Sequence, residues 1–233
     1  MPPALITVRD PHELGEALPR AGVVLGRPVL VCVGGAGGMT EDVESAVAAL
    51  ATDLLAPELD TLGAAVVDGG TDAGLMRAIG RARSLAGAEF PLIGVVAEGT
   101  VTLGVDADPR PGTAGPEPHH THLVVVPGDS WGDESPWLSQ VADIVAAGAR
   151  SATLLVNGGG ITLDDAEHSL RAGRPLVVLA GSGRVADDIL AAREAGTTTG
   201  LAGSIATSPL THVVRLDDPR GVVSAIGLLL GGD

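Results

Sequence analysis

Seven short stretches of the chain are apolar and rich in β-branched residues, as expected for strands. Their hydrophobicity is almost continuous, which is typical of parallel strands that are covered on both faces. These stretches lie at 29–33, 64–67, 92–96, 122–126, 153–156, 176–179 and 212–216.

Between these stretches, apolar residues recur at the spacing of amphipathic helices. Leu75, Ala78, Ile79 and Ala82 are one example, since residues three or four apart lie on the same face of a helix. The alternation of strand and helix predicts a Rossmann-like α/β fold, a doubly wound and mostly parallel sheet of about seven strands. The predicted helices lie at about 41–55, 73–86, 136–148, 163–172, 185–195 and 219–230.

Two segments without this periodicity are predicted to be loops. Residues 106–121, DADPRPGTAGPEPHHT, are rich in Pro and Gly, and residues 195–211 are rich in Gly and Thr. Because predicted strands continue after the first loop, we interpret it as a surface insertion. We therefore expect a single domain over 1–233, with its core at about 28–230.

Composition narrows the classes of partner. The formal net charge is −15, which opposes binding to nucleic acid or to an anionic membrane surface. The aromatic residues are only Phe90, Trp131 and Trp137, so stacking platforms for single-stranded nucleic acid are absent. A small phosphorylated ligand stays compatible with this charge, because local backbone amides would hold it.

The single cysteine and the hydropathy pattern indicate the compartment. Cys32 lies inside an apolar stretch, so it is predicted to be a buried core residue. No signal peptide is recognised and no apolar run reaches the length of a membrane helix. We expect a cytoplasmic protein that does not insert into a membrane.

Four glycine-rich segments follow four of the predicted strands: VGGAGGM, DGGTDAGLM, NGGGITLDD and AGSGR. The carboxyl ends of parallel strands share one edge of the sheet, where ligands bind. Glycines there let a ligand approach the backbone, and free amides at helix starts attract anions. One such segment is explained equally well as a tight turn, but four together predict a nucleotide-like ligand. None of them is a GxGxxG fingerprint or a Walker loop.

The candidate ligand-binding residues are those of the four segments and of the segment after the predicted strand 122–126. They are Gly34, Gly35, Ala36, Gly37, Gly38, Met39, Gly69, Gly70, Thr71, Gly74, Leu75, Met76, Asp129, Ser130, Trp131, Asn157, Gly158, Gly159, Gly160, Thr162, Gly181, Ser182, Gly183 and Arg184.

Some of these candidates have specific expected roles. Arg184, at the start of a predicted helix, is the best placed cation for a diphosphate, the alternative being a surface salt bridge. Trp131 has two possible roles: it covers the base or ribose of a ligand, or it packs over the end of the core. At Gly70 and Gly159, a Cβ is expected to fill the space that the phosphates need. Asp68 accepts ribose hydroxyls in this interpretation.

Two further sets of polar residues each allow two interpretations. Asp72 either accepts a ribose hydroxyl or caps its helix. Residues 119–122, with Asp106 and Asp108, can also be read as a metal cluster, because they include three histidines, but we expect no metal site.

The order and spacing of several motifs resemble one known family. VCVGGAGGM, VDGGTDAGLMRAIGRA, HTHLVVVPGDSWG and LLVNGGGITLDDAEHSLRAGRPLVVLAGSGRVADDI are similar to the SLOG domain of TRPM cation channels and its stand-alone prokaryotic relatives. The resemblance implies a Rossmann-like domain that senses nucleotide-derived ligands such as ADP-ribose, cyclic ADP-ribose or NAD, with no catalytic cofactor.

The wider superfamily includes the LOG phosphoribohydrolases, and their hallmark PGGxGTxxE is approximated here by NGGGITLDD. Asn157 stands in place of the Pro, Ile161 in place of the third Gly and Asp165 in place of the catalytic Glu. The predicted helix 136–148 lacks the Arg that these enzymes use. The resemblance therefore leaves two functions open: a nucleotide sensor, or an N-glycosidase with Asp165 as its catalytic carboxylate. By analogy, we also expect a homodimer and a separate effector protein.

Overall fold

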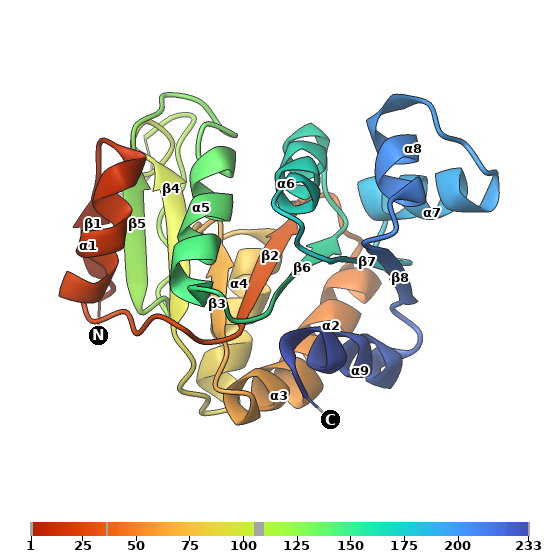
Figure 1. Cartoon of the computed structure of the whole chain (residues 1–233), viewed down its shortest axis with the longest axis horizontal. Helices are drawn as coiled ribbons and strands as arrows, with labels where there is room; N and C mark the ends of the chain where they lie inside the picture. The colour runs from red at the N-terminus through yellow and green to blue at the C-terminus, as the bar shows by residue number, and fades with distance from the viewer. Residues whose placement is uncertain (1, 36, 105–109, 233) are drawn as a thin grey trace.

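The computed structural model describes residues 2–35, 37–104 and 110–232. Its centre is one eight-stranded sheet in the order β1-β5-β4-β3-β2-β6-β7-β8, and every pair of neighbouring strands is parallel (Figure 1). The strands are β1 (Ala4–Thr7), β2 (Val29–Gly34), β3 (Ala65–Asp68), β4 (Leu92–Ala97), β5 (His122–Val126), β6 (Ser151–Val156), β7 (Leu176–Ala180) and β8 (Thr211–Arg215).

Helices cover both faces of this sheet (Figure 1). One face is covered by α1 (Leu14–Arg20), α5 (Ser135–Ala146), α6 (Gly160–Arg171), α7 (Arg184–Glu194) and α8 (Gly200–Thr207). The other face is covered by α2 (Glu41–Leu50), α3 (Ala56–Thr61), α4 (Gly74–Leu85) and α9 (Pro219–Leu230). The structure also describes a short 3-10 helix, η1 (Pro11–Glu13), and a π-helical segment, η2 (Ala51–Leu55).

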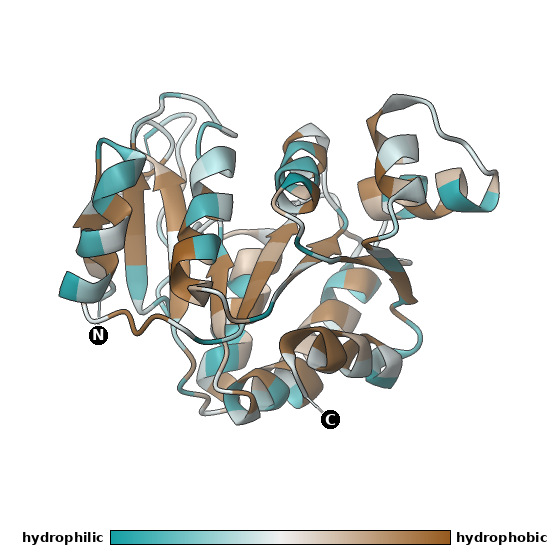
Figure 2. Cartoon of the chain, in the orientation of Figure 1, coloured by the Kyte–Doolittle hydropathy of each residue, from teal (hydrophilic) through white to brown (hydrophobic). Residues whose placement is uncertain are grey.

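Both sides of the central strands are buried, which explains their continuous hydrophobicity. In β2, Val29, Val31 and Val33 contribute to the core on one face, while Leu30 and Cys32 contribute to the core on the other. Most of the sheet is accordingly hydrophobic in the ribbon (Figure 2). The predicted doubly wound parallel fold and the burial of Cys32 are confirmed.

The sheet has one strand more than the seven predicted, namely β1 at its edge. Only one of the four residues of β1, Ile6, is buried, so the sequence of this strand carries no continuous apolar signal. The predicted helix 41–55 also extends further, passing through η2 into α3, which ends at Thr61. Within the predicted loop 195–211, the structure contains α8.

The predicted insertion 106–121 is irregular over its described part, residues 110–121, and residues 105–109 lie outside the described residues. Isolated bridges connect it to the rest of the molecule, Thr71 with Pro116 and Val101 with Ala114. It therefore lies beside the segment that follows β3.

The order of the strands places a ligand crevice at the end of β2. From β2 the chain passes through α2 and α3 to β3 on one side, whereas from β6 it passes through α6 to β7 on the other side. Because the two crossovers leave in opposite directions and cover opposite faces, a crevice opens between their loops, as is general for such sheets.

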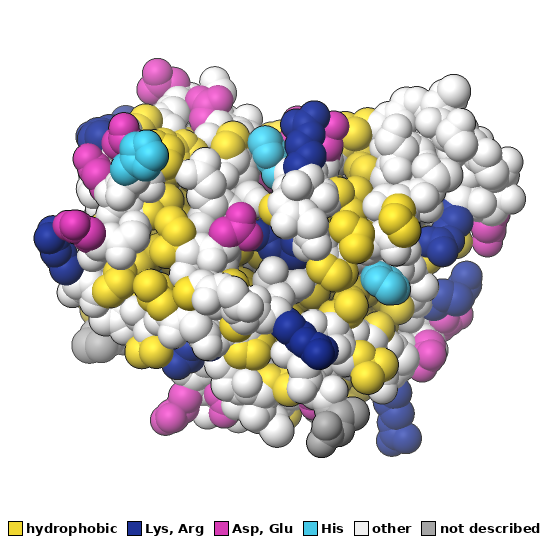
Figure 3. Space-filling model, viewed as in Figure 1, with side chains coloured by type: hydrophobic (Ala, Val, Ile, Leu, Met, Phe, Trp, Pro, Cys, Tyr) yellow, Lys and Arg dark blue, Asp and Glu magenta, His cyan; other side chains and the backbone are white. Residues whose placement is uncertain are grey.

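Within the described residues, no helix is both long enough and apolar enough to cross a bilayer. On the face shown in Figure 3, acidic and basic side chains are dispersed rather than gathered into one patch of a single sign.

Candidate functional site

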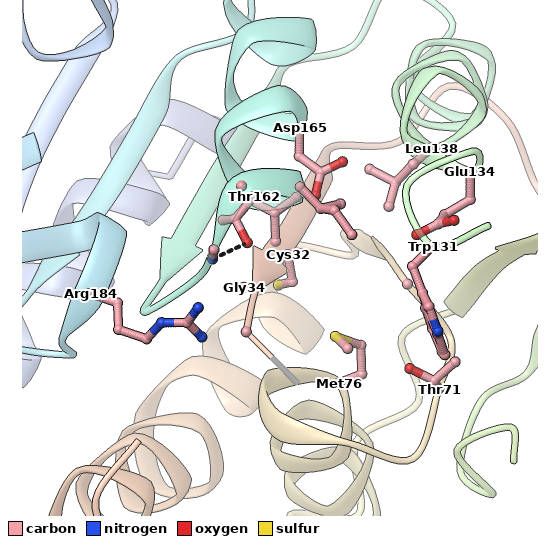
Figure 4. A pocket seen from close by; sticks show the side chains of 16 residues that line it. Cys32, Gly34, Thr71, Met76, Trp131, Glu134, Leu138, Thr162, Asp165 and Arg184 are labelled. Carbon is pink, nitrogen blue, oxygen red and sulfur yellow. Dashed lines mark hydrogen bonds between the residues drawn. The ribbon is translucent and has the colours of Figure 1, made fainter. Parts of the chain in front are cut away.

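A cavity of about 470 Å³ lies at this crevice, within the range of pockets that hold small organic ligands. Figure 4 shows its lining from close by. The lining residues are Cys32, Val33, Gly34, Gly35, Gly69, Thr71, Met76, Trp131, Glu134, Leu138, Gly159, Gly160, Ile161, Thr162, Asp165 and Arg184.

The glycine segments after β2 and β6 approach one another closely at the floor of the cavity. A Cβ on Gly35 would lie 2.7 Å from Asn157 Oδ1 and 3.3 Å from the Gly158 amide nitrogen. A larger residue at this position would separate the two segments. Glycine is therefore required here for the close approach that brings backbone groups of both strand ends to one site.

Asn157 and Ser182 fasten the end of β6 to the end of β7. The Asn157 side-chain amide donates to the Ser182 carbonyl at 2.8 Å, and Ser182 Oγ accepts from the Asn157 backbone amide at 2.7 Å. Both residues are buried and do not line the cavity. Their polar groups hold the segments in place, so in this structure their role is positioning.

The Arg184 side chain lies between the glycine segment that follows β2 and the one that follows β6. Arg184 is the first residue of α7 and has a left-handed backbone, with a φ of 50°. Its Nη1 donates to the Gly37 carbonyl at 3.2 Å, and a Cβ on Gly159 would lie 3.0 Å from its Nη2. The guanidinium is therefore next to the N-terminus of α6, where free amides attract anions. A phosphate placed there would meet a cation and helix amides together.

The carboxylates of Glu134 and Asp165 line another part of the cavity. Neither of them forms a salt bridge among the described residues. Burial, with a smaller contribution from the charges of Glu134 and Asp164, raises the pKa of Asp165 to about 7, while the nearby Ser135 hydroxyl partly offsets the shift. Burial also raises the pKa of Glu134. At neutral pH, therefore, Asp165 is partly protonated.

Apolar groups complete the lining. Trp131 is 45% exposed and its Nε1 donates to the Gly112 carbonyl at 3.1 Å, which fixes the indole at the cavity. Met76, Leu138 and Ile161 add further apolar surface. Figure 4 shows Arg184 on one side of the cavity and Trp131 with Glu134 on the opposite side. The site can thus hold a ligand with an anionic end and a planar end.

Behind the segment that follows β3, three buried charged groups form a network. His120 Nε2 lies 2.7 Å from Asp68 Oδ1, and His120 Nδ1 lies 2.9 Å from Glu117 Oε2. Burial alone would lower the pKa of His120, but the two carboxylates outweigh burial and raise it to about 10. Asp68 is therefore committed to this ion pair and to the Gly70 amide, away from the cavity lining.

Over the residues that the structure describes, no group of three or more His, Cys, Asp or Glu is arranged to hold a metal. His122 faces the Ala21 carbonyl and the Thr121 hydroxyl. Asp106 and Asp108 lie outside the described residues.

Many of the predicted ligand residues line the cavity, and the others do not, with Met39 and Gly74 lining a separate cavity. Those in the lining are Gly34, Gly35, Gly69, Thr71, Met76, Trp131, Gly159, Gly160, Thr162 and Arg184, joined by Asp165. Those outside the lining are Gly37, Gly38, Met39, Gly70, Gly74, Leu75, Asp129, Ser130, Asn157, Gly158, Gly181, Ser182 and Gly183, whereas Ala36 lies outside the described residues.

Gly70 differs from its expected role. It has a φ of +64°, and a Cβ there would lie 2.8 Å from Leu123 Cδ1 and 3.0 Å from Gly94 Cα. A side chain at position 70 would therefore occupy the packed interior rather than the space of a ligand. At Gly159, by contrast, a Cβ would project toward the Arg184 guanidinium.

Five lining residues were not predicted: Cys32, Val33, Glu134, Leu138 and Ile161. All of them except Glu134 are apolar residues of types that are common in protein cores. Glu134 carried a signal that could have been used, since it lies just after Trp131 at the start of a helix, on the same sheet edge.

Comparisons with known proteins agree with the fold. A family model described as SLOG in TRPM, prokaryote, matches residues 27–224. The molybdenum cofactor carrier protein MCP from Chlamydomonas reinhardtii is similar in structure, with a TM-score of 0.55 and 19% identity, covering 88% of this chain and 98% of that one. The structural genomics target TM1055 has a TM-score of 0.53 and 16% identity, covering 86% and 99%. No curated protein matches this chain.

Proposed function

This chain belongs to the family described as SLOG in TRPM, prokaryote, and from that membership we propose that it is a cytoplasmic module that binds and senses a nucleotide. ADP-ribose, cyclic ADP-ribose and NAD are the ligands that we propose to test first. In such a sensor, a homodimer or a separate effector protein would relay the binding event, and light scattering with and without nucleotide tests the dimer.

One observation carries the proposal: glycine segments from β2, β3 and β6 and the arginine that follows β7 converge on one cavity at the switch point of the sheet. Each contributes a feature suited to phosphate, either close backbone approach or a positive charge. Because Arg184 stands beside the start of α6, a diphosphate would be held by a guanidinium and by helix amides.

Thermal unfolding with each nucleotide tests this proposal. A ligand at about 100 times its Kd adds about 2.7 kcal/mol to the free energy of unfolding, which raises the Tm of a domain of this size by roughly 5 to 10 °C. Arg184→Gln should remove most of the shift. Arg171→Gln is the matched control, because Arg171 is exposed and pairs with Glu167 outside the cavity.

Absence of a shift with all three nucleotides at millimolar concentration would contradict the proposal. A shift that persists in Arg184→Gln would place the phosphates elsewhere in the cavity or on the surface.

A glycosidase is the second candidate, and the observation in its favour is that Asp165 lines the cavity. Two features weigh against it. The segment Ser135–Ala146, which forms α5, contains no Arg or Lys. A pKa of about 7 also leaves Asp165 partly uncharged at neutral pH, which weakens its ability to oppose a developing positive charge.

Chromatography of AMP and ADP-ribose after incubation with the protein separates the two candidates. Binding alone leaves both compounds intact. Release of adenine from either compound, with ribose 5-phosphate as the other product from AMP, at more than about 0.1 per second would establish the enzyme if Asp165→Asn abolishes it, since typical enzymes turn over at 1 per second or faster.

A further inference from the structure

The two sides of the cavity have opposite electrostatic character. Arg184 is the one Arg, Lys or His in the lining, as far as the described residues show, and it stands on the side of the glycine segments. Glu134 and Trp131 stand across from it, and Asp165 lies on α6 between the two sides (Figure 4). A ligand that satisfies both sides must combine an anionic part with a cationic part.

The acidic side lacks a cationic partner among the described residues. The Glu134 carboxylate accepts a bond from the Gly132 amide at 3.0 Å, but neither it nor Asp165 has a salt bridge among the described residues. Carboxylates taken out of water without a cation nearby cost free energy, and a cationic ligand would recover that cost.

A buried hydroxyl lies next to the two carboxylates. Ser135, next to Glu134, is buried, and its Oγ has no hydrogen-bond partner in the part of the chain that the structure describes. This hydroxyl lies near the Asp165 carboxyl, beside the cavity.

Trp131 supplies the aromatic surface that a flat cation requires. Its single polar group is already used, because Nε1 donates to the Gly112 carbonyl, so it contributes its rings alone. A cation over an indole face is stabilised by the ring quadrupole, and Trp is the best residue for this contact. Carboxylates beside such a face favour a positively charged ring over a neutral one.

We propose that the cavity selects the oxidised form of a pyridine nucleotide, with its phosphates toward Arg184 and its positively charged pyridinium ring between Trp131 and the carboxylates of Glu134 and Asp165. This inference rests on the proposed nucleotide binding and specifies the chemical class of the ligand. The reduced form has the same phosphates and riboses but an uncharged ring, so it lacks the group that the acidic side recognises.

Isothermal titration with NAD⁺, NADH and ADP-ribose at neutral pH tests this selection. NAD⁺ should bind about tenfold more tightly than NADH or better, which corresponds to a strong cation–π contact with additional charge pairing. Glu134→Gln and Trp131→Leu should each bring the ratio of the two Kd values close to one, chiefly by weakening NAD⁺. Asp188→Asn, which removes an exposed carboxylate on α7 outside the cavity, should leave the ratio unchanged.

Each outcome separates the two proposals. If ADP-ribose binds but NAD⁺ and NADH bind equally, or if the preference persists in Glu134→Gln and Trp131→Leu, the charge selection is wrong and nucleotide binding stands. If none of the three binds to the unaltered protein, both proposals fall. Far-UV circular dichroism of each variant establishes that it is folded, and Glu134→Asp, which keeps the charge, should retain part of the preference.

Discussion

Glu117 fills the space beside Gly80 that a larger residue at position 80 would need. A Cβ on Gly80 would lie 2.2 Å from Glu117 Oε2. Gly80 is in the middle of α4, whereas Glu117 belongs to the irregular segment 110–121, and its carboxylate accepts bonds from the His119 amide and from His120. A glycine thus allows the segment to pack a charged group against a helix.

Gly80→Ala should destabilise the protein, although alanine is the better helix former. The overpacked carboxylate cannot move without breaking its bonds to the histidines, so we expect a loss of about 1 to 3 kcal/mol in urea unfolding. Gly15→Ala in α1 is the control, since none of the described atoms beyond its neighbours comes within 4 Å of a Cβ there. The control should gain about 0.4 to 1 kcal/mol. A gain in both variants would show that Glu117 does not contact α4.

His120→Gln should cost about 3 to 5 kcal/mol at pH 7, because two buried carboxylates lose their cation. The folded pKa of His120, about 10, lies above its value in the unfolded chain, so the stabilisation is complete below pH 6.5 and is lost as pH rises through 10. The unaltered protein should therefore lose stability faster than the variant between pH 7 and pH 10.

Urea unfolding at several alkaline pH values measures this difference. The sequence contains no Lys and no Tyr, so few other groups titrate in that range. Parallel curves for the two proteins would mean that His120 is not charged in the folded state.

Asp165→Asn should stabilise the protein, and more so at higher pH. The folded pKa of about 7 exceeds the ordinary value of 3.8, so ionisation of Asp165 costs stability increasingly from pH 3.8 up to pH 7. The gain at pH 8 should exceed the gain at pH 5.5 by about 2 kcal/mol. Asp164→Asn on the exposed side of α6 is the control and should change stability little. An equal gain at both pH values would show that Asp165 titrates normally.

Gly159→Val and Gly70→Val should fail in different ways. At Gly159 the φ is −134° and the nearest atom to a Cβ belongs to the movable end of Arg184, so the variant should fold but lose the ADP-ribose shift. At Gly70 the positive φ and the contacts with Leu123 and Gly94 should lower the Tm without ligand. Differential scanning fluorimetry with and without nucleotide separates the two, and normal binding by Gly159→Val would move the phosphates away from α6.

The parts of the fold that the sequence could predict are those whose signal is local. Continuous apolar runs such as 153–156 identify buried strands, because burial on both faces leaves no polar positions. β1 could not be found in this way, since it exposes three of its four residues and is defined by its pairing with β5. Likewise, α8 is too short and glycine-rich for periodicity to distinguish it from a loop.

The candidate site shows the same division. Glycines at strand ends predicted its position, because topology brings those ends together. The function of a single glycine could not be predicted: Gly70 faces the core and Gly159 faces Arg184, although both follow strands in similar motifs. Glu134 became a candidate only once tertiary structure showed that it shares a cavity with Asp165.

The edge position of β1 has a consequence for the order in which the protein assembles. Residues Ala4–Thr7 are synthesised well before their partner β5, in which His122 lies opposite Ala4. Closing a contact between residues so far apart in sequence costs chain entropy before it gains any bond, which makes such pairings late events in folding. During synthesis, β1 cannot pair until β5 has been made, so this strand joins the sheet later than its place in the chain order suggests.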